Sequence, residues 1–467
     1  MSETAFLTHR SDLNRLMSFL SEGECCAVVA LSNVGKSTLL RNIASPAGQA
    51  QLASKGPSAS TEGRGGGMAF FYVDCNLMLT LTEQGFYEAA LRSALAEVKR
   101  LGAAKALVGR LQDLYHKVVE PSSPFLAPLS FNEAIVALSE ELGRRVVFLF
   151  DEFDDPFARL DGRVFLNLRA LRDKYGDRLC FVTATGTELC EQRQDAEAAE
   201  FCELFAERAI YLTGLSRDEA GQVVAWIARN ESVELDRDEV DFVLKQAGGH
   251  LGLLQAVTAV LIRVAAGAPV NLRARSLMVA RQQLDSEGPV RAECAKLWEQ
   301  LSHGDREALV RFLASGSKPP LDGAMQVLLR KGILVGHRSP SVEGEPPAVF
   351  GELFAGYARR QHRVQQTVRP SVYVDVDSGD VWVDGRRAPV LTDHEYRLLL
   401  LLYGRMNKIV TRDDVAEAVW GADYMENIDD ARCDKLLSRL RGKIEADPAN
   451  PKYLSTVRGR GYKLVNE

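Results

Sequence analysis

The sequence predicts an α/β fold: a parallel sheet with helices on both faces, followed by further helices and by a C-terminal domain of short strands and helices. Three observations lead to this prediction. A short apolar segment runs through a loop containing Gly35 into a helical pattern, strands and helices then alternate up to about residue 213, and basic residues concentrate near the C-terminus. With 467 residues, of which 46% are hydrophobic and 26% charged, the chain can form several globular domains.

Charge and cysteine content restrict where such a protein can work. The formal net charge is −6, so a nucleic acid must be bound by a local basic patch and not by the field of the whole chain. The eight cysteines form no CxxC pair and several stand within apolar runs, which favours reduced core thiols and a cytoplasmic location. The amino end has no basic region followed by an apolar run, and no apolar stretch approaches about 18 residues, so we expect neither secretion nor a membrane partner.

The first elements lead into a phosphate-binding loop. Residues 5–22 carry apolar side chains near helical spacing, and residues 25–29 are apolar enough for a buried strand. The segment 30–38, ALSNVGKST, follows that strand and precedes a helical pattern, which is the context that a P-loop requires. The loop needs glycine because backbone N–H groups must approach phosphate oxygens closely, although Ala30 stands where the first glycine is usual. The residues expected to bind the nucleotide are Asn33, Val34, Gly35, Lys36, Ser37 and Thr38.

The next part of the chain is expected to add one strand and several helices. Residues 45–67 are rich in Gly, Ser, Ala and Pro, a composition that predicts a mobile insertion beside the nucleotide. Residues 70–74 have the apolar character of a second buried strand. A mainly helical region then follows from residue 83 to residue 142, with an interruption at residues 121–124.

An apolar strand that ends in paired acids completes the predicted nucleotide site. Residues 146–150 are apolar and run into Asp151 and Glu152, the Walker B pattern that accompanies a P-loop. Asp151 can hold Mg²⁺ together with the hydroxyl of Ser37, and Glu152 can orient or deprotonate the attacking water. Lys36 can reach the β- and γ-phosphates. The expected catalytic residues are Lys36, Asp151 and Glu152, and the expected metal ligands are Ser37 and Asp151.

Two further strands, at residues 179–183 and 209–213, complete the predicted sheet. Either Thr183 or Thr185 stands where a polar sensor of the γ-phosphate is expected, and a threonine that caps the strand end is an equal alternative. Solvated loop charges are expected at Asp154 and Asp155. No arginine finger can be chosen among four arginines whose default role is surface charge: Arg159, Arg169, Arg172 and Arg208.

Four segments together resemble the STAND class of signalling ATPases, which are relatives of AAA+ proteins. They are the P-loop, residues 148–152, residues 212–220 and residues 248–254. The resemblance implies a P-loop ATPase domain at residues 1–214, a helical lid at residues 215–299 and a first winged-helix domain at residues 300–363. It also implies binding of ATP or ADP with Mg²⁺, slow hydrolysis of ATP to ADP and phosphate, and assembly into a homo-oligomer.

The chain departs from this class in the lid. The class usually carries a proline where this chain has Leu251. Relatives outside bacteria often have a nucleotide-sensing histidine in the first winged helix, and this sequence has none at that place. His250 is the nearest candidate for a role in the lid, and a structural histidine is the alternative reading.

A polar, basic linker is predicted at residues 364–371, before a C-terminal domain at residues 372–467. Short alternating segments at its start predict antiparallel strands, and capping boxes at Thr392 and Thr411 open two helices. A third helix, at residues 428–444, has an apolar face that can pack and a basic face that can enter a groove of nucleic acid. Between Arg432 and Lys463 there are nine basic and three acidic residues, which form the local patch that the overall charge requires.

The segments 438–448 and 453–462 closely resemble the DNA-binding domain of OmpR/PhoB-type response regulators. The resemblance implies a winged helix-turn-helix that places its third helix in the major groove of double-stranded DNA and its wing in the minor groove. It assigns DNA contacts to Arg432, Lys435, Arg439, Arg441, Arg458 and Arg460. Residues 421–427 correspond to a loop that can touch RNA polymerase in this family. The usual receiver domain is replaced by the ATPase, so a separate sensor protein is expected to supply the input.

Together these motifs favour a transcription regulator whose ATP- or ADP-bound state controls the exposure or oligomerisation of its DNA-binding domain. Two alternatives remain open. One is a DNA-dependent ATPase that remodels or loads onto DNA, which strong stimulation of turnover by DNA would indicate. The other is a STAND-type ATPase of defence or stress signalling, which a lack of discrete genomic binding sites would favour.

Overall fold

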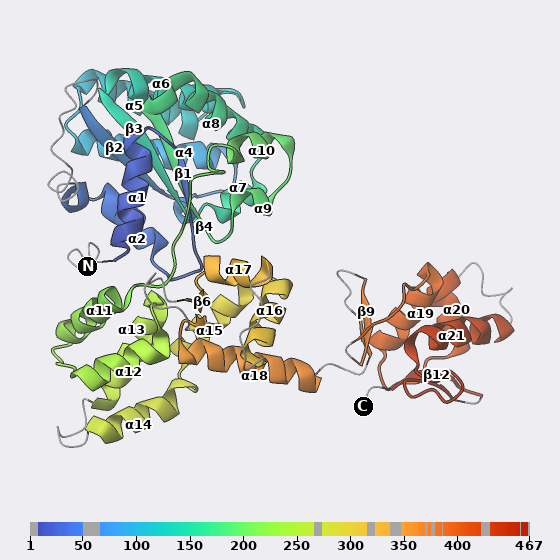
Figure 1. The fold of residues 1–467 in the computed structure, drawn as a ribbon. Helices are drawn as coiled ribbons and strands as arrows, with labels where there is room; N and C mark the ends of the chain where they lie inside the picture. Colours follow the sequence, from blue (N-terminus) through green and yellow to red (C-terminus); the bar gives the residue numbers. More distant parts are fainter. Residues whose placement is uncertain are drawn as a thin grey trace. The chain divides into compact units, whose positions relative to one another are not determined.

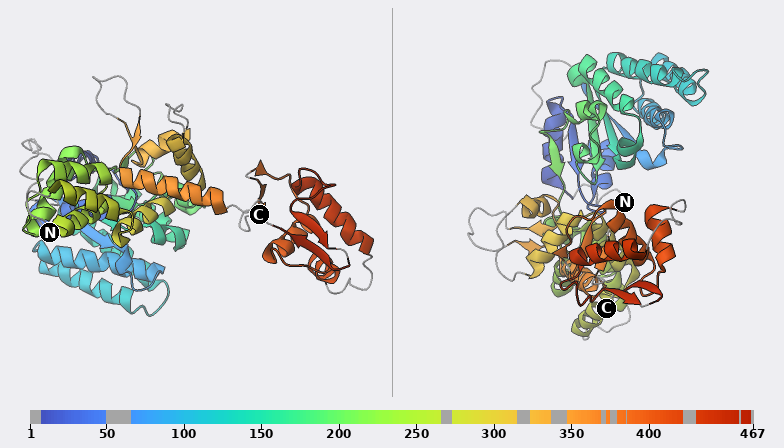
Figure 2. Two further views of the ribbon diagram at one scale, coloured as in Figure 1. Left: turned by 90° about the horizontal axis from the view of Figure 1, so that it is seen from below. Right: turned by 90° about the vertical axis from the view of Figure 1, so that its right-hand side faces the viewer.

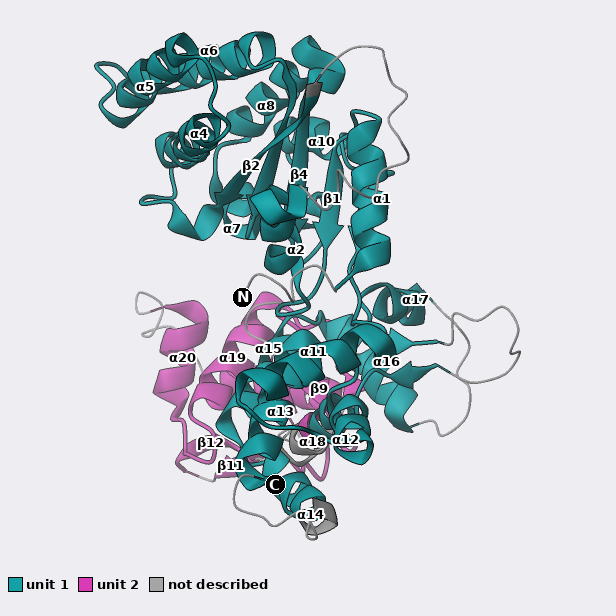
Figure 3. Cartoon of the chain, turned by 90° about the vertical axis from the view of Figure 1, so that its left-hand side faces the viewer, with its two compact units in different colours: residues 1–359 teal, residues 360–467 magenta. Residues whose placement is uncertain are grey.

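The computed structural model describes residues 8–49, 66–265, 273–314, 323–336, 347–368, 372–374, 379–384, 386–421, 430–457 and 459–465. The chain divides into two compact units, residues 1–359 (unit 1) and residues 360–467 (unit 2), shown in Figure 3. Each unit has its own cluster of buried apolar side chains. Among the described residues no helix combines the length and apolar character needed to cross a bilayer.

A five-stranded parallel sheet forms the centre of unit 1 (Figure 1). Its strands are β1 (Cys26–Val29), β2 (Gly66–Asp74), β3 (Arg144–Asp151), β4 (Leu179–Thr185) and β5 (Ala209–Tyr211). Their order is β2-β3-β4-β1-β5, and every pairing is parallel. The register places Asp74 beside Asp151 and Val29 beside Thr185, so the carboxyl ends of the strands meet at one edge. The predicted parallel sheet is confirmed.

Helices pack around this sheet. In chain order they are α1 (Arg10–Ser21), α2 (Lys36–Ala44), α4 (Glu83–Arg100), α5 (Lys105–Val119), α6 (Leu126–Glu141), α7 (Asp154–Arg159), α8 (Gly162–Tyr175), α9 (Leu189–Gln192) and α10 (Ala196–Cys202). The predicted interruption at residues 121–124 lies between α5 and α6. Most of the predicted insertion, residues 50–65, lies outside the described residues.

The rest of unit 1 is mainly helical and gathers beyond the strand ends from which the P-loop leaves (Figures 1 and 2). Its first helices are α11 (Arg217–Asn230), α12 (Arg237–Ala247), α13 (Leu251–Ala265), α14 (Arg273–Leu284) and α15 (Gly288–Glu299). They occupy the region predicted as a lid. Next come α16 (His303–Ala314), α17 (Gly323–Arg330), the antiparallel strands β6 (Leu334–Val335) and β7 (Ala348–Val349), and α18 (Glu352–Val368). Two helices followed by a hairpin are the order expected of a winged helix.

Helix α18 extends into the segment predicted as a linker. It is continuous through residue 368, so residues 364–368 of the expected linker at residues 364–371 are helical. The remaining linker positions lie outside the described residues.

Unit 2 has the element order predicted from its sequence. A three-stranded sheet contains β8 (Val372–Val374), β9 (Val381–Val383) and β10 (Arg386–Arg387). Helices α19 (Asp393–Gly404), α20 (Arg412–Trp420) and α21 (Asp430–Ile444) precede the hairpin of β11 (Leu454–Val457) and β12 (Gly461–Leu464). The predicted capping boxes at Thr392 and Thr411 are both present. Apolar side chains of α19, α20, α21 and the hairpin form one core.

All eight cysteines are described, and all are free thiols. Seven of them are buried, and Cys190 is exposed. Burial raises the pKa of the Cys180 and Cys202 thiols to about 12, so both are unreactive core side chains.

Candidate functional site

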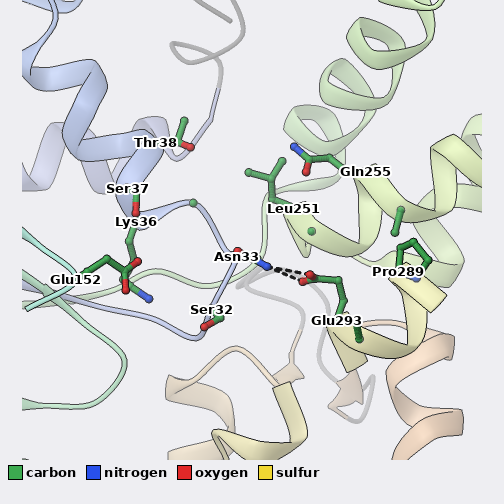
Figure 4. A pocket seen from close by; sticks show the side chains of 14 residues that line it. Ser32, Asn33, Lys36, Ser37, Thr38, Glu152, Leu251, Gln255, Pro289 and Glu293 are labelled. Atoms are coloured by element: carbon green, nitrogen blue, oxygen red, sulfur yellow. Dashed lines mark hydrogen bonds between the residues drawn. The ribbon is translucent and has the colours of Figure 1, made fainter. Parts of the chain in front are cut away.

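A cavity of about 560 Å³ lies between the P-loop and the helices of the predicted lid (Figure 4). The P-loop side contributes residues 32, 33 and 35–38, and Glu152 lines the same space. The opposite wall comes from helices α13 and α15: Leu251, Gly252, Gln255, Ala256, Pro289, Ala292 and Glu293. The cavity is large enough for a nucleotide, because ligand pockets commonly have about 300–1,000 Å³.

The P-loop combines glycine geometry with a buried lysine. Asn33 and Gly35 have positive φ angles of 57° and 128°, so the loop turns sharply before α2 begins at Lys36. Lys36 is buried, and its Nζ donates to the carbonyl oxygens of Ala30 at 2.6 Å and Leu31 at 3.3 Å. Burial lowers the pKa of Lys36, against the opposing effect of the neighbouring carboxylates of Glu152, Asp154 and Asp151. Bound phosphate would offer this ammonium group a charged partner in place of two carbonyls.

Asp151 is held by a network that the sequence did not indicate. Its side chain is fully buried, and its Oδ2 accepts a hydrogen bond of 2.6 Å from the hydroxyl of Tyr72 on β2. Arg41 of α2 donates to that hydroxyl at 2.9 Å, and its guanidinium lies 3.6 Å from Asp74. The backbone N–H of Glu152 donates to Oδ1 at 3.1 Å. The carboxylate of Asp151 is therefore fixed from two sides.

The residues that follow Asp151 connect strands β3 and β4. Glu152 has a positive φ of 52°, a left-handed conformation that costs a non-glycine residue about 1–3 kcal/mol. Desolvation and the neighbouring Asp151 raise the pKa of Glu152. Asp154 was expected to be a solvated loop charge, but its carboxylate accepts hydrogen bonds from the Gly186 backbone at 2.9 Å and from Gln192 at 3.0 Å. It fixes the loop after β4 against the segment that follows β3.

Both candidate sensor threonines lie on β4. The Oγ1 of Thr183 is buried and has no hydrogen-bond partner among the described residues. Thr185 donates to the Thr187 carbonyl at 2.7 Å, as a threonine that caps a strand end would. Within the described part of the chain Thr183 makes no such hydrogen bond, so it remains the candidate for a polar sensor of the γ-phosphate.

The four arginines considered as a finger all pair elsewhere. Arg172 donates to the Gly23 carbonyl, and Arg208 lies 3.5 Å from Glu24; both partners precede β1, at the end of that strand opposite the P-loop. The other two form ion pairs within or near their own helices: Arg159 with Asp155, and Arg169 with Asp173 and Glu203. None of the four lines the cavity.

Residues on the helical side of the cavity contact the first half of the P-loop directly. The buried His250 approaches the Ser32 carbonyl with its Nε2 at 2.9 Å and stacks on Phe350. Gln300 accepts from the Ser32 backbone N–H at 2.7 Å, and the Gly252 N–H donates to the Asn33 carbonyl at 3.1 Å. From the amino-terminal side, the buried His9 approaches the Val34 carbonyl at 3.0 Å. No local pattern identified His9 or Gln300, because their partners are distant in the chain.

Ser37 and Asp151, the two predicted metal ligands, are residue types that a magnesium ion prefers. Mg²⁺ usually takes one or two protein oxygens and completes its shell with water and substrate phosphates. Ser37 lines the cavity, whereas the carboxylate of Asp151, oriented by Tyr72, is fully buried and does not line it. Among the described residues there is no group of three or more His, Cys, Asp or Glu side chains that could hold a metal ion. A bound ion would neutralise phosphate charge at this place.

The predicted DNA-binding residues of unit 2 separate into two groups. Arg432, Lys435 and Arg439 are exposed on α21, and Arg460 is exposed at the tip between β11 and β12. The guanidinium of Arg432 lies over the Trp420 ring, 5.5 Å from its centroid. These four cations are available to a polyanion. Arg458 lies outside the described residues, as do residues 422–427 of the loop predicted to touch RNA polymerase.

Arg441, also predicted to contact DNA, is half-buried and hydrogen-bonded to the wing. Its Nε donates to the Leu454 carbonyl at 2.8 Å and its Nη2 to the Thr456 hydroxyl at 2.9 Å. The buried Glu445, one helical turn further, accepts the backbone N–H groups of residues 452, 453 and 454. The end of α21 therefore positions the wing. Sequence spacing could not separate Arg441 from Arg439, because the difference depends on where the hairpin packs.

Comparison with known proteins identifies the C-terminal region. Residues 386–464 match the family described as "Transcriptional regulatory protein, C terminal". The sensory transduction protein RegX3 of Mycobacterium tuberculosis is 45% identical over 93 residues, which cover 20% of this chain and 40% of RegX3. The chain thus spans less than half the length of this relative.

Two solved structures are similar to separate parts of the chain. The Walker-type ATPase PABY2304 of Pyrococcus abyssi matches over 75% of this chain and 95% of its own, with 15% identity and a TM-score of 0.43. The DNA-binding domain of RstA from Klebsiella pneumoniae, solved with the RstA box, matches over 20% of this chain and 91% of its own, with 26% identity and a TM-score of 0.19. With its P-loop, its sheet order and the family match, the chain joins a P-loop ATPase-like fold to an OmpR/PhoB-type winged-helix domain.

Proposed function

We propose that this protein is a transcription regulator whose DNA binding is controlled by ATP or ADP with Mg²⁺. The observation that carries the proposal is the composition of the cavity: one wall is the P-loop and the other is formed by α13 and α15. A nucleotide in this space must contact both walls. Its presence and its number of phosphates can therefore change how the helices are held against the sheet.

The helices that follow the lid offer a mechanical route for this change. Arg330 at the end of α17 donates to Glu188 at 3.0 Å and lies over the Tyr211 ring, 5.3 Å from its centroid. Glu188 follows β4, and Tyr211 ends β5. The first winged-helix region is thus attached to the strand ends that border the nucleotide site. A ligand shifts such an equilibrium only by binding the two arrangements unequally.

Slow hydrolysis of ATP would reset the switch. Lys36 would bind the β- and γ-phosphates, and Ser37 and Asp151 would hold the ion. Glu152, whose raised pKa suits a proton acceptor, would orient or deprotonate the attacking water. The proposal also includes assembly of the chain into a homo-oligomer and contacts with RNA polymerase and with a separate sensor protein.

Double-stranded DNA is the proposed partner of unit 2. Its exposed cations lie on α21 and at the wing tip, where a winged helix meets the major and minor grooves. The family match to transcriptional regulators supports DNA as this partner, and so does the similarity to RegX3, which is named a sensory transduction protein.

The test compares Lys36→Ala with Lys117→Ala, which removes an exposed lysine from α5. Nucleotide affinity is measured by calorimetry, and DNA affinity of the full chain by fluorescence anisotropy with ADP, with ATP and without nucleotide. We expect Lys36→Ala to abolish both nucleotide binding and the nucleotide dependence of DNA affinity, while the isolated fragment 360–467 binds DNA equally under all conditions. DNA affinity of the wild-type chain that is independent of nucleotide would reject the switch. Turnover strongly stimulated by DNA would instead favour a DNA-dependent ATPase.

A further inference from the structure

We propose that Glu293 is the residue by which the closed arrangement distinguishes nucleoside diphosphates from triphosphates. The inference rests on the proposed function, because it assigns a specificity-determining residue to the same cavity. The structure described here would be the arrangement that a diphosphate tolerates. A triphosphate would oppose it by repelling the carboxylate of Glu293.

The contact between Asn33 and Glu293 joins the P-loop to helix α15. Asn33 Nδ2 donates to both carboxylate oxygens of Glu293, at 3.0 and 2.8 Å (Figure 4). Both residues line the cavity that also contains Lys36 and Ser37. The Glu293 side chain is only 15% exposed, so water screens its charge incompletely.

Helix α13 packs against this contact. Helix α13 approaches the loop through Gly252, where a Cβ atom would lie 2.5 Å from a Glu293 carboxylate oxygen and 3.0 Å from Asn33 Cβ. The Gly252 N–H is the donor to the Asn33 carbonyl. The packing of helices α13 and α15 against the P-loop therefore holds Glu293 at the loop.

A carboxylate is the opposite of what a phosphate site normally presents. P-loops surround phosphate oxygens with N–H groups and a lysine, because each added phosphate brings further negative charge. Glu293 brings a negative charge into hydrogen-bond contact with that loop. Repulsion between Glu293 and the nucleotide must increase from diphosphate to triphosphate. The closed arrangement therefore has a higher free energy with a triphosphate bound than with a diphosphate.

Lys296 pairs with Glu293 and reduces this repulsion without removing it. Lys296 Nζ is 3.3 Å from a Glu293 oxygen, and the Lys296 side chain is 54% exposed. An exposed ammonium group is well hydrated and its field is screened. Lys36, which lines the cavity, is already directed at the carbonyls of Ala30 and Leu31.

The experiment measures the dissociation constants of the full chain for Mg·ADP and for the magnesium complex of the non-hydrolysable analogue adenylyl imidodiphosphate. It compares the wild type with Glu293→Gln, which can still accept a hydrogen bond from Asn33 but carries no charge. Glu299→Gln is the matched control, since Glu299 is exposed on the same helix and does not line the cavity. Glu293→Ala is a second variant that removes both the charge and the hydrogen bond.

We expect Glu293→Gln and Glu293→Ala to tighten triphosphate binding relative to diphosphate binding by at least about fivefold, the lower end of usual coupling strengths. Glu299→Gln should leave the ratio unchanged. A ratio that is unchanged in both Glu293 variants, or that shifts equally in Glu299→Gln, would overturn the inference while the proposed function stands. If the folded wild-type chain binds neither nucleotide, the proposed function fails and the inference fails with it.

Discussion

The hydroxyl of Tyr72 offers a sharp test of how the end of strand β3 is organised. Tyr72→Phe removes the donor 2.6 Å from Asp151 Oδ2 and the acceptor 2.9 Å from Arg41, and leaves the aromatic ring in place. A hydrogen bond to a charged group contributes about 1.5–3 kcal/mol, and Asp151 is fully buried while Tyr72 is partly buried. We expect the free energy of unfolding of unit 1 to fall by about 2 kcal/mol.

The assay is a urea titration of the fragment 1–359, which has its own hydrophobic core and contains Trp226 and Trp298 as fluorescent reporters. The matched control is Tyr175→Phe, whose hydroxyl donates at 3.2 Å to Glu140 on the protein surface. This exposed contact should contribute less than about 1 kcal/mol. Saturating Mg·ADP should reduce the loss in Tyr72→Phe, because the cation offers Asp151 a new partner. Equal losses in the two variants would refute the assignment of Tyr72 as the residue that positions Asp151.

Three further outcomes follow from the structure. Arg460→Ala should weaken binding to every duplex and lower the salt slope by about one unit, whereas Lys435→Ala should change sequence preference in a competition assay; the same uniform loss for both would contradict these roles. Arg441→Ala should destabilise unit 2 by about 1–2 kcal/mol in urea titrations through its two lost hydrogen bonds to the wing, while the exposed Arg439→Ala should stay within about 0.5 kcal/mol. Burial lowers the pKa of His250, so the unfolded chain binds its proton first as the pH falls. The unfolding free energy of fragment 1–359 should therefore decrease below about pH 7, and His250→Gln should weaken that dependence; an unchanged pH profile would contradict the assignment.

Local patterns in the sequence determined the parts of this protein that depend on neighbouring residues. The apolar run into Asp151 predicted β3, the glycine and lysine of residues 30–38 predicted the loop before α2, and the capping boxes at Thr392 and Thr411 predicted the starts of two helices. These features could be read because strand period, helix period and capping chemistry act over a few residues.

The tertiary structure alone decided which side chains surround those motifs. Tyr72 and Asp151 are 79 positions apart, and Asn33 and Glu293 are 260 positions apart. Arg439 and Arg441 lie on the same helix, yet only the hairpin's position commits Arg441 to the wing. Contacts of this kind depend on the order of the strands and on the packing of the helices. No periodicity within one segment carries that information, because the energy of each contact comes from a partner that the fold brings from elsewhere in the chain.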